Sequence, residues 1–388
     1  MKKKKIVVIT SRFPYPLDKG DKLRIYHQIK DMSSYHNIYL ISLNAGQKIH
    51  KSELKEVKKY CKEVTVIQLP LITRIVNVVK SFLNNEPIQV GYFYSAKAHT
   101  VINNTIQETQ PDWIYHQLIR TAKYTKTQHL TTIDYMDALS KGIERRIKNF
   151  PFFLRPLITR EFQITSRYEK EVFDNFNKHI IITENDRNFI KHKKNKLIKV
   201  IPNGVDTNYF KPNENVKKTY DIVFVGNMSY PPNIEAAVYL CKNILPIIHK
   251  TRGTCNVLIA GTSPHKKVQN LKSKNITISG RLEDIREAYS SASVFVAPMF
   301  IGTGLQNKLL EAMAMGIPCV TTKLANNALL ANSSQIITAN NPEEFANACV
   351  KILNNEKFAK NLSIEALKFI QEKYDWQKIN YKLSKLFN

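Results

Sequence analysis

The chain has 388 residues, of which 43% are hydrophobic, so it is long enough for two domains and too apolar for general disorder. Its formal net charge of +26 indicates either anionic partners (phosphorylated substrates, nucleic acid or a membrane surface) or a lysine-rich proteome. The five scattered cysteines form no C-x-x-C pair, and no apolar run approaches the roughly 18 to 20 residues of a membrane span. We therefore expect a cytoplasmic protein without disulfides or structural zinc.

Short β-branched runs alternate with amphipathic helical patterns along the whole chain. They lie at 5–10, 38–43, 64–69, 112–117, 131–136 and 179–184, and again at 221–226, 256–261, 276–280, 293–298, 319–322 and 336–339. Strands that alternate with helices indicate parallel sheets covered on both faces. The two series predict an α/β chain with two doubly wound, Rossmann-like domains.

The first expected strand is followed by a polar loop, TSRFPYPLDKGDKLRIYHQI, that leads into a helix. Gly20 at the start of this helix would let backbone N–H groups approach a phosphate, which the helix dipole favours. Lys19, Lys22 and Arg24 add positive charge. Asp18 and Asp21 either cap the helix or contact an acceptor hydroxyl.

Two later strand ends in the first half also carry polar side chains. His116 is either a donor to a sugar hydroxyl or phosphate, or a buried structural histidine. Asp134 and Asp137 follow the next strand, and Asp137 is the better placed loop residue. Because ligands of doubly wound sheets bind at the carboxyl ends of the strands, we expect His116 and Asp137 to be candidates for catalysis.

Two segments of the first half combine apolar and basic residues. They are LPLITRIVNVVKSFL at 69–83, with Arg74 and Lys80, and NFPFFLRPLITREFQI at 149–164, with two arginines. Each is either a core helix of the first domain or a segment that lies on an anionic membrane surface or holds a lipid-linked acceptor.

The domain boundary is expected within 203–218, where Pro, Asn and Gly interrupt the pattern. The predicted domains are 1–205 and 206–370, followed by a terminal helical segment at 371–388. That segment is either continuous or broken at Tyr374-Asp375, with Asp375 as the N-cap of a second helix. A break would let it return to the first domain.

In the second half, strands end in glycine and lead into helices. Gly226 stands in VFVGNMSYPPNIEAA, and Arg281 and Glu283 follow the glycine of ITISGRLEDI. These loops lie at the sheet edge where ligands bind.

The stretch SVFVAPMFIGTGLQNKLLEAMAMG carries the strongest signal. Gly302, Thr303 and Gly304 stand at a strand-to-helix turn that suits a diphosphate. Lys308 and Glu311 are spaced i,i+3 and share one helix face, while Leu309, Ala312 and Met313 form the packed face. A carboxylate at this position can accept both hydroxyls of a ribose. Since Asn307 replaces the third glycine of G-x-G-x-x-G, the pattern favours a nucleoside diphosphate over a dinucleotide; the alternative is a Lys–Glu surface pair.

Residues 279–322, SGRLEDIREAYSSASVFVAPMFIGTGLQNKLLEAMAMGIPCVTT, resemble the donor-binding signature of glycosyltransferase family 4, which has the GT-B fold. VIPNGVDTNYF resembles that family's interdomain crossover. VFVGNMSYPPNIEAA and SRFPYPLDKGDKLRIYHQIK resemble a subgroup of bacterial sugar transferases from exopolysaccharide systems. The likeness covers nearly the whole chain.

This resemblance implies two facing Rossmann-like domains, a nucleotide-sugar donor held mainly by the second, and a retaining transfer that needs no metal or other cofactor. Glu311 matches the glutamate that binds the donor ribose, Arg281 and Leu282 match the stretch beside the nucleobase, and Gly20 matches the glycine loop near the phosphates. The candidate donor site comprises Gly20, Gly226, Arg281, Leu282, Gly302, Thr303, Gly304, Leu305, Lys308 and Glu311. The catalytic candidates are His116, Asp137 and Lys308, and the acceptor-side candidates are Asp18, Lys19, Asp21 and Arg24.

Two positions depart from the family pattern. Thr303 stands where many members carry a first glutamate, and the loop GNMSYPPN lacks the Arg and Lys that many carry there. Phosphate charge must then be neutralised by Lys308, Arg281 or lysines of the first domain.

The leading interpretation is a glycosyltransferase of cell-surface polysaccharide synthesis that uses a saccharide or lipid-linked saccharide acceptor, at the inner face of a membrane if the acceptor is lipid-linked. A GT-B-like epimerase or phosphorylase is the alternative among enzymes, although no pyridoxal lysine site is evident. A nucleic-acid-binding protein is suggested by charge alone, and no stacking aromatics or reader motif supports it. The missing third glycine opposes a nicotinamide oxidoreductase.

Overall fold

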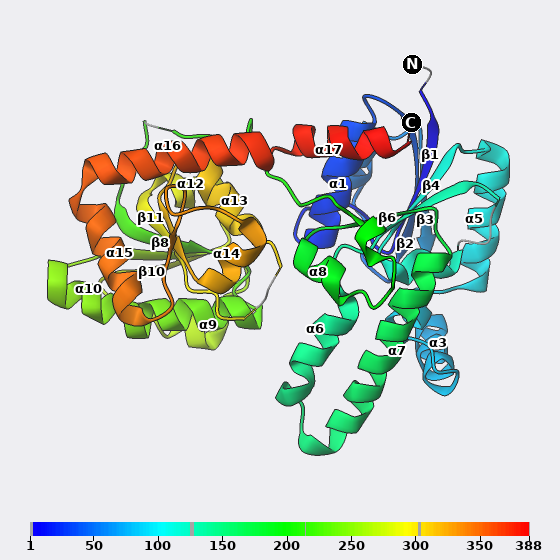
Figure 1. Cartoon of the computed structure of the whole chain (residues 1–388), viewed down its shortest axis with the longest axis horizontal. Helices are drawn as coiled ribbons and strands as arrows, with labels where there is room; N and C mark the ends of the chain where they lie inside the picture. Colours follow the sequence, from blue (N-terminus) through cyan, green and yellow to red (C-terminus); the bar gives the residue numbers. More distant parts are fainter. Residues whose placement is uncertain (1–2, 125–127, 214, 302–303, 388) are drawn as a thin grey trace. The chain divides into compact units, whose positions relative to one another are not determined.

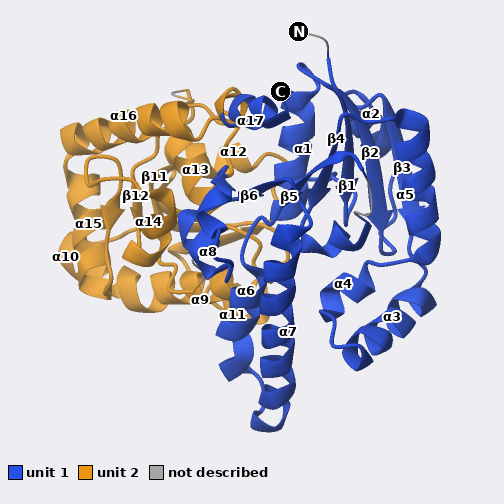
Figure 2. Ribbon diagram, turned by 45° about the vertical axis from the view of Figure 1, so that its right-hand side comes forward, with its two compact units in different colours: residues 1–202, 379–388 blue, residues 203–378 orange. Residues whose placement is uncertain are grey.

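The computed structural model describes residues 3–124, 128–213, 215–301 and 304–387. The chain divides into two compact units, which Figure 2 colours separately. Unit 1 is Met1–Pro202 with Ile379–Asn388, and unit 2 is Asn203–Lys378. The predicted limits were residues 205 and 370, so the first boundary lies slightly earlier and the second slightly later than expected.

Unit 1 is built on a seven-stranded parallel sheet in the order β3-β2-β1-β4-β5-β6-β7. The order reverses between β1 and β4, which makes this the switch point where the loops that follow the two strands diverge. The strands are β1 (Lys5–Thr10), β2 (Asn37–Asn44), β3 (Glu63–Gln68), β4 (Trp113–Gln117), β5 (Leu130–Asp134), β6 (Lys178–Ile181) and β7 (Lys199–Val200).

The helices of unit 1 connect these strands, and two insertions extend beyond the sheet. The helices are α1 (Gly20–Met32), α2 (Lys51–Lys58), α3 (Leu71–Leu83), α4 (Ile88–Tyr92), α5 (Ala96–Thr109), α6 (Leu139–Arg146), α7 (Arg155–Asp174) and α8 (Glu184–Phe189), with short 3-10 turns η1 (Ile119–Tyr124), η2 (Ile147–Asn149), η3 (Phe152–Leu154) and η4 (Asn195–Leu197). Figure 1 shows α6 and α7 as a long hairpin that leaves the sheet, with α3 beside it. Continuous apolar strands such as β1 form the buried core between the helical layers.

Unit 2 has a six-stranded parallel sheet in the order β10-β9-β8-β11-β12-β13. Its strands are β8 (Tyr220–Val225), β9 (Val257–Ala260), β10 (Ile276–Gly280), β11 (Ala292–Ala297), β12 (Cys319–Thr321) and β13 (Ile337–Thr338). Here the switch point falls between β8 and β11. The two parallel sheets confirm the predicted pair of doubly wound, Rossmann-like domains.

Helices cover both faces of the second sheet. They are α9 (Pro231–Tyr239), the π-helical η5 (Leu240–Ile244), α10 (Leu245–Arg252), α11 (Lys266–Gln269), α12 (Ile285–Ser290), α13 (Asn307–Ala314), α14 (Lys323–Leu329), α15 (Pro342–Asn354) and α16 (Glu356–Lys373). In Figure 1, α9 and α10 lie on one side of the sheet and α13 and α16 on the other. One large apolar core joins the strands to both layers.

The C-terminal segment is broken at the predicted place. Helix α16 ends at Lys373, and α17 (Trp376–Ser384) begins after Asp375, whose Oδ1 accepts a hydrogen bond of 3.2 Å from the backbone N–H of Lys378. The backbone of Val205 bonds to both sides of the break, donating to the carbonyl of Tyr374 (2.8 Å) and accepting from Trp376 (3.2 Å). These bonds keep the break within unit 2, which accounts for the boundary at Lys378.

Beyond this break, the final residues complete the core of unit 1. The amide of Asn380 donates to the carbonyl of His27 at 3.1 Å. The ring of Phe387, in η6 (Lys385–Phe387), is fully buried and packs edge-on against His36, Trp113 and Tyr115.

Candidate active site

The carboxyl edge of the second sheet presents two strand-to-helix loops at its switch point. Strand β8 leads through Gly226 into α9, and the neighbouring β11 leads through Pro298 toward α13. The connection after β8 leads to β9 on one side of the switch point, and the connection after β11 leads to β12 on the other side. A ligand can therefore enter between the two loops.

Lys308 in the first turn of α13 reaches across this switch point. Its Nζ donates a hydrogen bond to Oδ1 of Asn233 on α9, and it lies 5.1 Å from the ring centroid of Phe224 and 3.9 Å from Sδ of Met299. Burial of the ammonium lowers the pKa of Lys308 to about 8, against the raising effect of Glu311. The side chain therefore carries its charge at neutral pH in an environment of low polarity, where its field is strong.

Glu311 lies one turn further along the same helix face. Its Oε2 accepts a hydrogen bond of 2.8 Å from Oη of Tyr289, a fully buried residue of α12. Burial raises the pKa of Glu311 to about 7, although Tyr289 and Lys308 both act to lower it. Within the described residues Tyr289 is the one hydrogen-bond donor to this carboxylate, so Oε1 is available to a ligand hydroxyl.

Asn233 is itself fixed by close packing of the loop after β8. Its Nδ2 donates to the carbonyl of Asn227 at 2.9 Å. A Cβ placed on Gly226 would lie 2.7 Å from this Nδ2, and one on Gly261, whose φ is +139°, would lie 1.7 Å from the carbonyl oxygen of Gly226. Gly226 thus serves the packing that positions Asn233.

The start of α13 is open on the side of its glycine. Among the residues that the structure describes, which omit 302 and 303, no atom lies within 4 Å of a Cβ built on Gly304. The helix begins at Asn307, after Gln306 as its N-cap, and no described side chain caps its free N–H groups. Leu305 packs partly buried against the core, and Leu309, Ala312 and Met313 are fully buried, as the helical periodicity predicted. The predicted donor residues Gly302 and Thr303 lie outside the described residues.

Arg281 and Leu282 follow β10, the edge strand of the sheet. The side chain of Arg281 is exposed, and Leu282 packs partly buried against the core. Strand β9 lies between β10 and the switch point, so Arg281 and Leu282 are apart from Lys308 and Glu311 along the sheet edge. They form a second part of the candidate donor surface.

At the switch point of unit 1, Asp21 is the centre of a basic cluster. Its Oδ2 accepts a hydrogen bond of 2.6 Å from Arg12 and lies 4.0 Å from Arg120, and Gln117 donates to its backbone carbonyl at 2.6 Å. Burial and the neighbouring Arg12 lower the pKa of Arg120. Two guanidinium groups held so close to one carboxylate leave this edge positively charged.

The remaining residues of the glycine loop are solvent-facing. Gly20 begins α1, with no atom of a described residue within 4 Å of a Cβ built on it, and Lys19 is exposed. Asp18 is 53% exposed and pairs with Lys22 at 2.9 Å, an i,i+4 contact. Asp18 thus pairs with a lysine of the first turn of α1 and does not cap the helix, whose N-cap is Lys19 without a side-chain cap bond.

Two predicted site residues are buried instead. Arg24 has no exposed surface, and its Nε donates to Oδ2 of Asp134 at 2.6 Å while its Nη1 donates to the carbonyl of Pro202 at 3.2 Å. This ion pair turns Arg24 away from solvent, so its prediction as an acceptor-side residue was wrong. His116 is also fully buried, with its ring against Phe176 and Nδ1 within 3.1 Å of the carbonyl of Thr121.

Burial lowers the pKa of His116 to about 4, so it is neutral at physiological pH. The structural role that the sequence left open fits this environment, and His116 is withdrawn as a catalytic candidate. Asp137, by contrast, has an exposed side chain. Asp137 therefore remains a candidate with access to solvent.

Comparison with known proteins decides between the enzyme classes. Residues 219–355, which span most of unit 2 and contain the Lys308–Glu311 site, match the family model of glycosyl transferases group 1. The second unit is a group 1 glycosyltransferase domain. The chain that carries it is a glycosyltransferase with the GT-B fold.

Similar proteins agree with this assignment. The chain is 24% identical over 395 residues to an uncharacterized 44.6 kDa protein in the cps region of Klebsiella pneumoniae, with 97% of each chain covered. It is 27% identical over 179 residues to an Escherichia coli UDP-Gal:alpha-D-GlcNAc-diphosphoundecaprenol alpha-1,3-galactosyltransferase, covering 41% of this chain and 46% of the relative. The solved structure of Anabaena HepE in complex with UDP matches with a TM-score of 0.71 and 14% identity, covering 98% and 99% of the two chains.

Sequence reasoning about the glycosyltransferase missed Asn233 and Tyr289, which hold its two central side chains. Asn233 stands in the first turn of the helix that follows a strand-end glycine, and that position was the available signal. Tyr289 lies in a short helix, and nothing in the sequence pairs it with a residue on another helix.

No group of three or more His, Cys, Asp or Glu side chains suited to a metal ion is found among the described residues. Over the same part of the chain, no helix is both long and apolar enough to cross a membrane.

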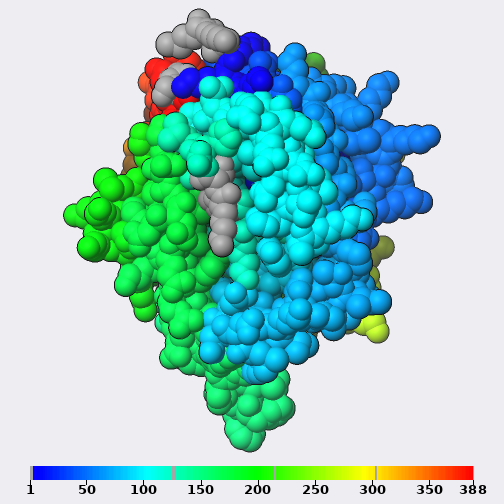
Figure 3. Space-filling model, turned by 90° about the vertical axis from the view of Figure 1, so that its right-hand side faces the viewer, coloured from blue at the N-terminus to red at the C-terminus, as the bar shows by residue number. Residues whose placement is uncertain are grey.

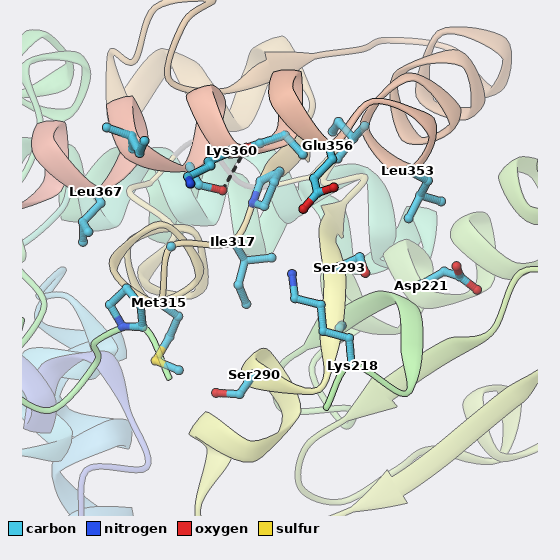
Figure 4. A pocket seen from close by; sticks show the side chains of 18 of the residues that line it. Lys218, Asp221, Ser290, Ser293, Met315, Ile317, Leu353, Glu356, Lys360 and Leu367 are labelled. Carbon is cyan, nitrogen blue, oxygen red and sulfur yellow. Dashed lines mark hydrogen bonds between the residues drawn. The ribbon is translucent and has the colours of Figure 1, made fainter. Parts of the chain in front are cut away.

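The glycosyltransferase domain also has a hollow of about 760 Å³ away from this site. Figure 4 shows Lys218 and Glu356 pointing into it. Lys218, Asp221 and Ser293 lie at the amino ends of β8 and β11, opposite to the edge that carries Lys308. Since ligands of doubly wound sheets bind at the carboxyl edge, we assign no role in sugar transfer to this hollow.

Proposed function

We propose that the protein transfers a sugar, with retention, from a nucleoside-diphosphate sugar to a saccharide or lipid-linked saccharide acceptor in the synthesis of a cell-surface polysaccharide. The observation that carries the proposal is the placement of Lys308 and Glu311 one helical turn apart at the switch point of unit 2.

Glu311 is the proposed ribose ligand. Its Oε2 is held by Tyr289, which fixes the carboxylate and leaves Oε1 to accept from a ribose hydroxyl. Hydrogen bonds to an ionised carboxylate are roughly twice as strong as neutral ones, so this contact anchors the nucleoside.

Lys308 is the proposed phosphate ligand. The loop Gly226–Tyr230 contains no Lys or Arg. Asn233 accepts a hydrogen bond from the ammonium of Lys308 and so holds this cation beside the loop. As the sugar–phosphate bond breaks, negative charge grows on the diphosphate, and a fixed cation in a poorly solvated site stabilises it. The open N–H groups at the start of α13 add to this effect.

We infer that the donor is a uridine diphosphate sugar. HepE was solved with UDP, and the Escherichia coli relative is named for a UDP-Gal donor and a diphosphoundecaprenol acceptor. The acceptor class proposed here follows from that relative and from the cps region of the Klebsiella pneumoniae protein. On unit 1, the exposed residues Lys19 and Asp137 are the proposed acceptor-side residues, together with Asp21, whose side chain is 11% exposed.

The experiment measures transfer of labelled sugar from UDP-, GDP- and ADP-sugars to a diphosphoundecaprenol-linked saccharide, with the product anomer determined by NMR. We expect transfer from a UDP-sugar with retained configuration, undiminished by EDTA, since no metal ligand cluster is proposed. Conversion of the donor to an isomeric sugar nucleotide without acceptor would support the epimerase alternative. Loss of transfer in EDTA that Mn²⁺ restores would refute the metal-independent mechanism.

A further inference from the structure

Helix α3 exposes its apolar side chains to solvent. Leu71, Ile72, Ile75, Val76, Val79, Phe82 and Leu83 are all exposed, with Ile72 at 77% and Leu83 at 70%. Their spacing of three to four residues places them on one stripe of the helix. An exposed stripe of this size on a folded protein marks a binding surface.

The polar side of α3 faces the protein. Nη1 of Arg74 donates to Oη of Tyr92 at 2.5 Å, and Nδ2 of Asn77 donates to the carbonyl of Tyr94 at 2.7 Å. Ser81 is buried against Gly91, where a Cβ would lie 1.8 Å from its Oγ. The helix is therefore inverted: hydrogen bonds attach it to α4, and its apolar face is outside. This excludes the core-helix alternative for this segment.

The tip of the α6–α7 hairpin carries a second exposed apolar group. Phe152 is 78% exposed and Phe153 is 65% exposed, and Phe150 and Leu157 are exposed as well. Arg155 fixes this tip by donating to the carbonyls of Phe150 (3.1 Å) and Lys148 (3.2 Å). The aromatic side chains are thus held outside by an ordered turn.

The two apolar groups belong to one surface, because α7 is bonded to the end of α3. Arg160 donates to the carbonyl of Phe82 and to Oδ1 of Asn85, both at 2.6 Å, and its guanidinium lies 4.3 Å from the Phe82 ring centroid. With a rise of 1.5 Å per helical residue, Arg155 at the start of α7 lies about 7.5 Å along the helix axis from this contact, and Phe153 stands two residues before it. Figure 3 shows the hairpin and the α3 region adjoining on one face of unit 1.

Basic residues border this surface. Lys80 on α3 and Arg145, Arg146, Lys148 and Arg155 at the hairpin are exposed, and segment 144–160 contains one acidic residue, Glu144. Helix α3 contains none. A second copy of this chain would bring like charges together, whereas an anionic bilayer offers opposite charge at its headgroups and an apolar interior below them.

We propose that the stripe of α3 and the tip of the α6–α7 hairpin form one docking surface for an anionic membrane. The apolar side chains of this surface insert into the membrane to the depth of the headgroups. The identity of the lipid-linked acceptor rests on the proposed function, but the docking itself does not. The full-length protein is expected to co-sediment with vesicles of equal parts phosphatidylglycerol and phosphatidylcholine, to remain in solution with phosphatidylcholine alone, and to be released by high salt.

Two kinds of variant separate the apolar and charge contributions. Ile72→Ser with Val79→Ser, and Phe152→Ser with Phe153→Ser, should each reduce the vesicle-bound fraction about tenfold, even at low salt. Lys80→Glu with Arg146→Glu and Lys148→Glu should reduce it by a similar factor and weaken its salt dependence. Arg74 and Arg160 are left unchanged because they hold α3 in place.

Matched controls lie on α16 of unit 2. Ile364→Ser removes a side chain that is 53% exposed, and Lys357→Glu with Lys360→Glu reverses exposed charges. Both should bind vesicles as the wild type does, and UDP binding should be unchanged in every variant.

Wild-type protein that stays in solution with anionic vesicles, or apolar variants that bind as wild type, would overturn the proposal. A stable dimer that the Ile72→Ser and Val79→Ser changes dissociate would do so as well, by assigning the surface to a second copy. None of these results would affect the donor site, which UDP binding tests separately.

Discussion

The ammonium of Lys308 is hydrogen-bonded to the side-chain oxygen of Asn233, across the switch point between β8 and β11. The contact joins the helices that follow the two strands, α13 and α9. A buried amide thereby positions a cation in a loop region that has no cation of its own. The relationship suggests that Asn233 acts through Lys308, as a positioning residue.

Asn233→Asp tests this relationship. A carboxylate beside Lys308 should raise the lysine's pKa above its present value of about 8 and neutralise its field. We expect kcat to fall with little change in donor KM, and the alkaline limb of the kcat profile to move to higher pH. Asn243→Asp, at an exposed position of η5, is the matched control. An unchanged pH profile in Asn233→Asp would show that the amide does not influence Lys308.

Lys308→Ala removes the cation itself. If the ammonium stabilises the departing diphosphate, kcat should decrease far more than the affinity for UDP. In the wild type, kcat should decline as the pH rises through about 8, where Lys308 loses its proton. Steady-state kinetics over pH 6 to about 10 check both points. Equal kcat in mutant and wild type would leave Lys308 as a structural residue only.

Glu311→Gln should weaken UDP binding by about 1.5–3 kcal/mol, or roughly ten- to hundredfold, because the amide loses charge-assisted hydrogen bonds to the ribose. Calorimetric titration with UDP above the pKa of about 7 measures the loss. Glu287→Gln, at an exposed position of α12, serves as control and should bind normally.

The same variant should change how stability depends on pH. Burial raises the pKa of Glu311 in the folded protein to about 7 from an ordinary 4.5, so the folded state holds the proton more tightly than the unfolded chain. Its contribution to stability is complete below pH 4.5 and is lost as the pH rises to about 7. Glu311→Gln should therefore gain in Tm relative to wild type over that interval. A constant difference in Tm would contradict the raised pKa.

Arg24→Met should affect stability and leave donor binding intact. Removal of the guanidinium leaves Asp134 buried without its cation, which costs about 3–5 kcal/mol of unfolding free energy. Urea denaturation measures this cost, and Lys19→Ala, at an exposed neighbouring position, should change it by less than about 0.5 kcal/mol. A normal stability for Arg24→Met would reopen the acceptor-side role predicted from the sequence.

Periodicity was sufficient to predict the two sheets and the packed face of α13, because Leu309, Ala312 and Met313 follow the geometry of a single helix. The burial of Arg24 could not be predicted in this way, because its partner Asp134 lies on a strand 110 positions away. The sequence shows the charge of Arg24 but not whether the side chain points into the core or to solvent. The orientation of α3 was equally hidden. Its apolar stripe is normal for a core helix, and only the bonds to Tyr92 and Tyr94 show that the polar side is inside.

The burial of Phe387 against Trp113 and Tyr115 has a consequence for synthesis on the ribosome. Unit 1 contains Met1–Pro202, yet its core is closed only by residues made about 185 positions later. At translation rates of about 5–20 residues per second, the nascent first unit waits roughly 10–40 s with this part of its core uncovered. Unit 2 is complete in sequence before that, at Lys378, so the domain translated second can finish folding first.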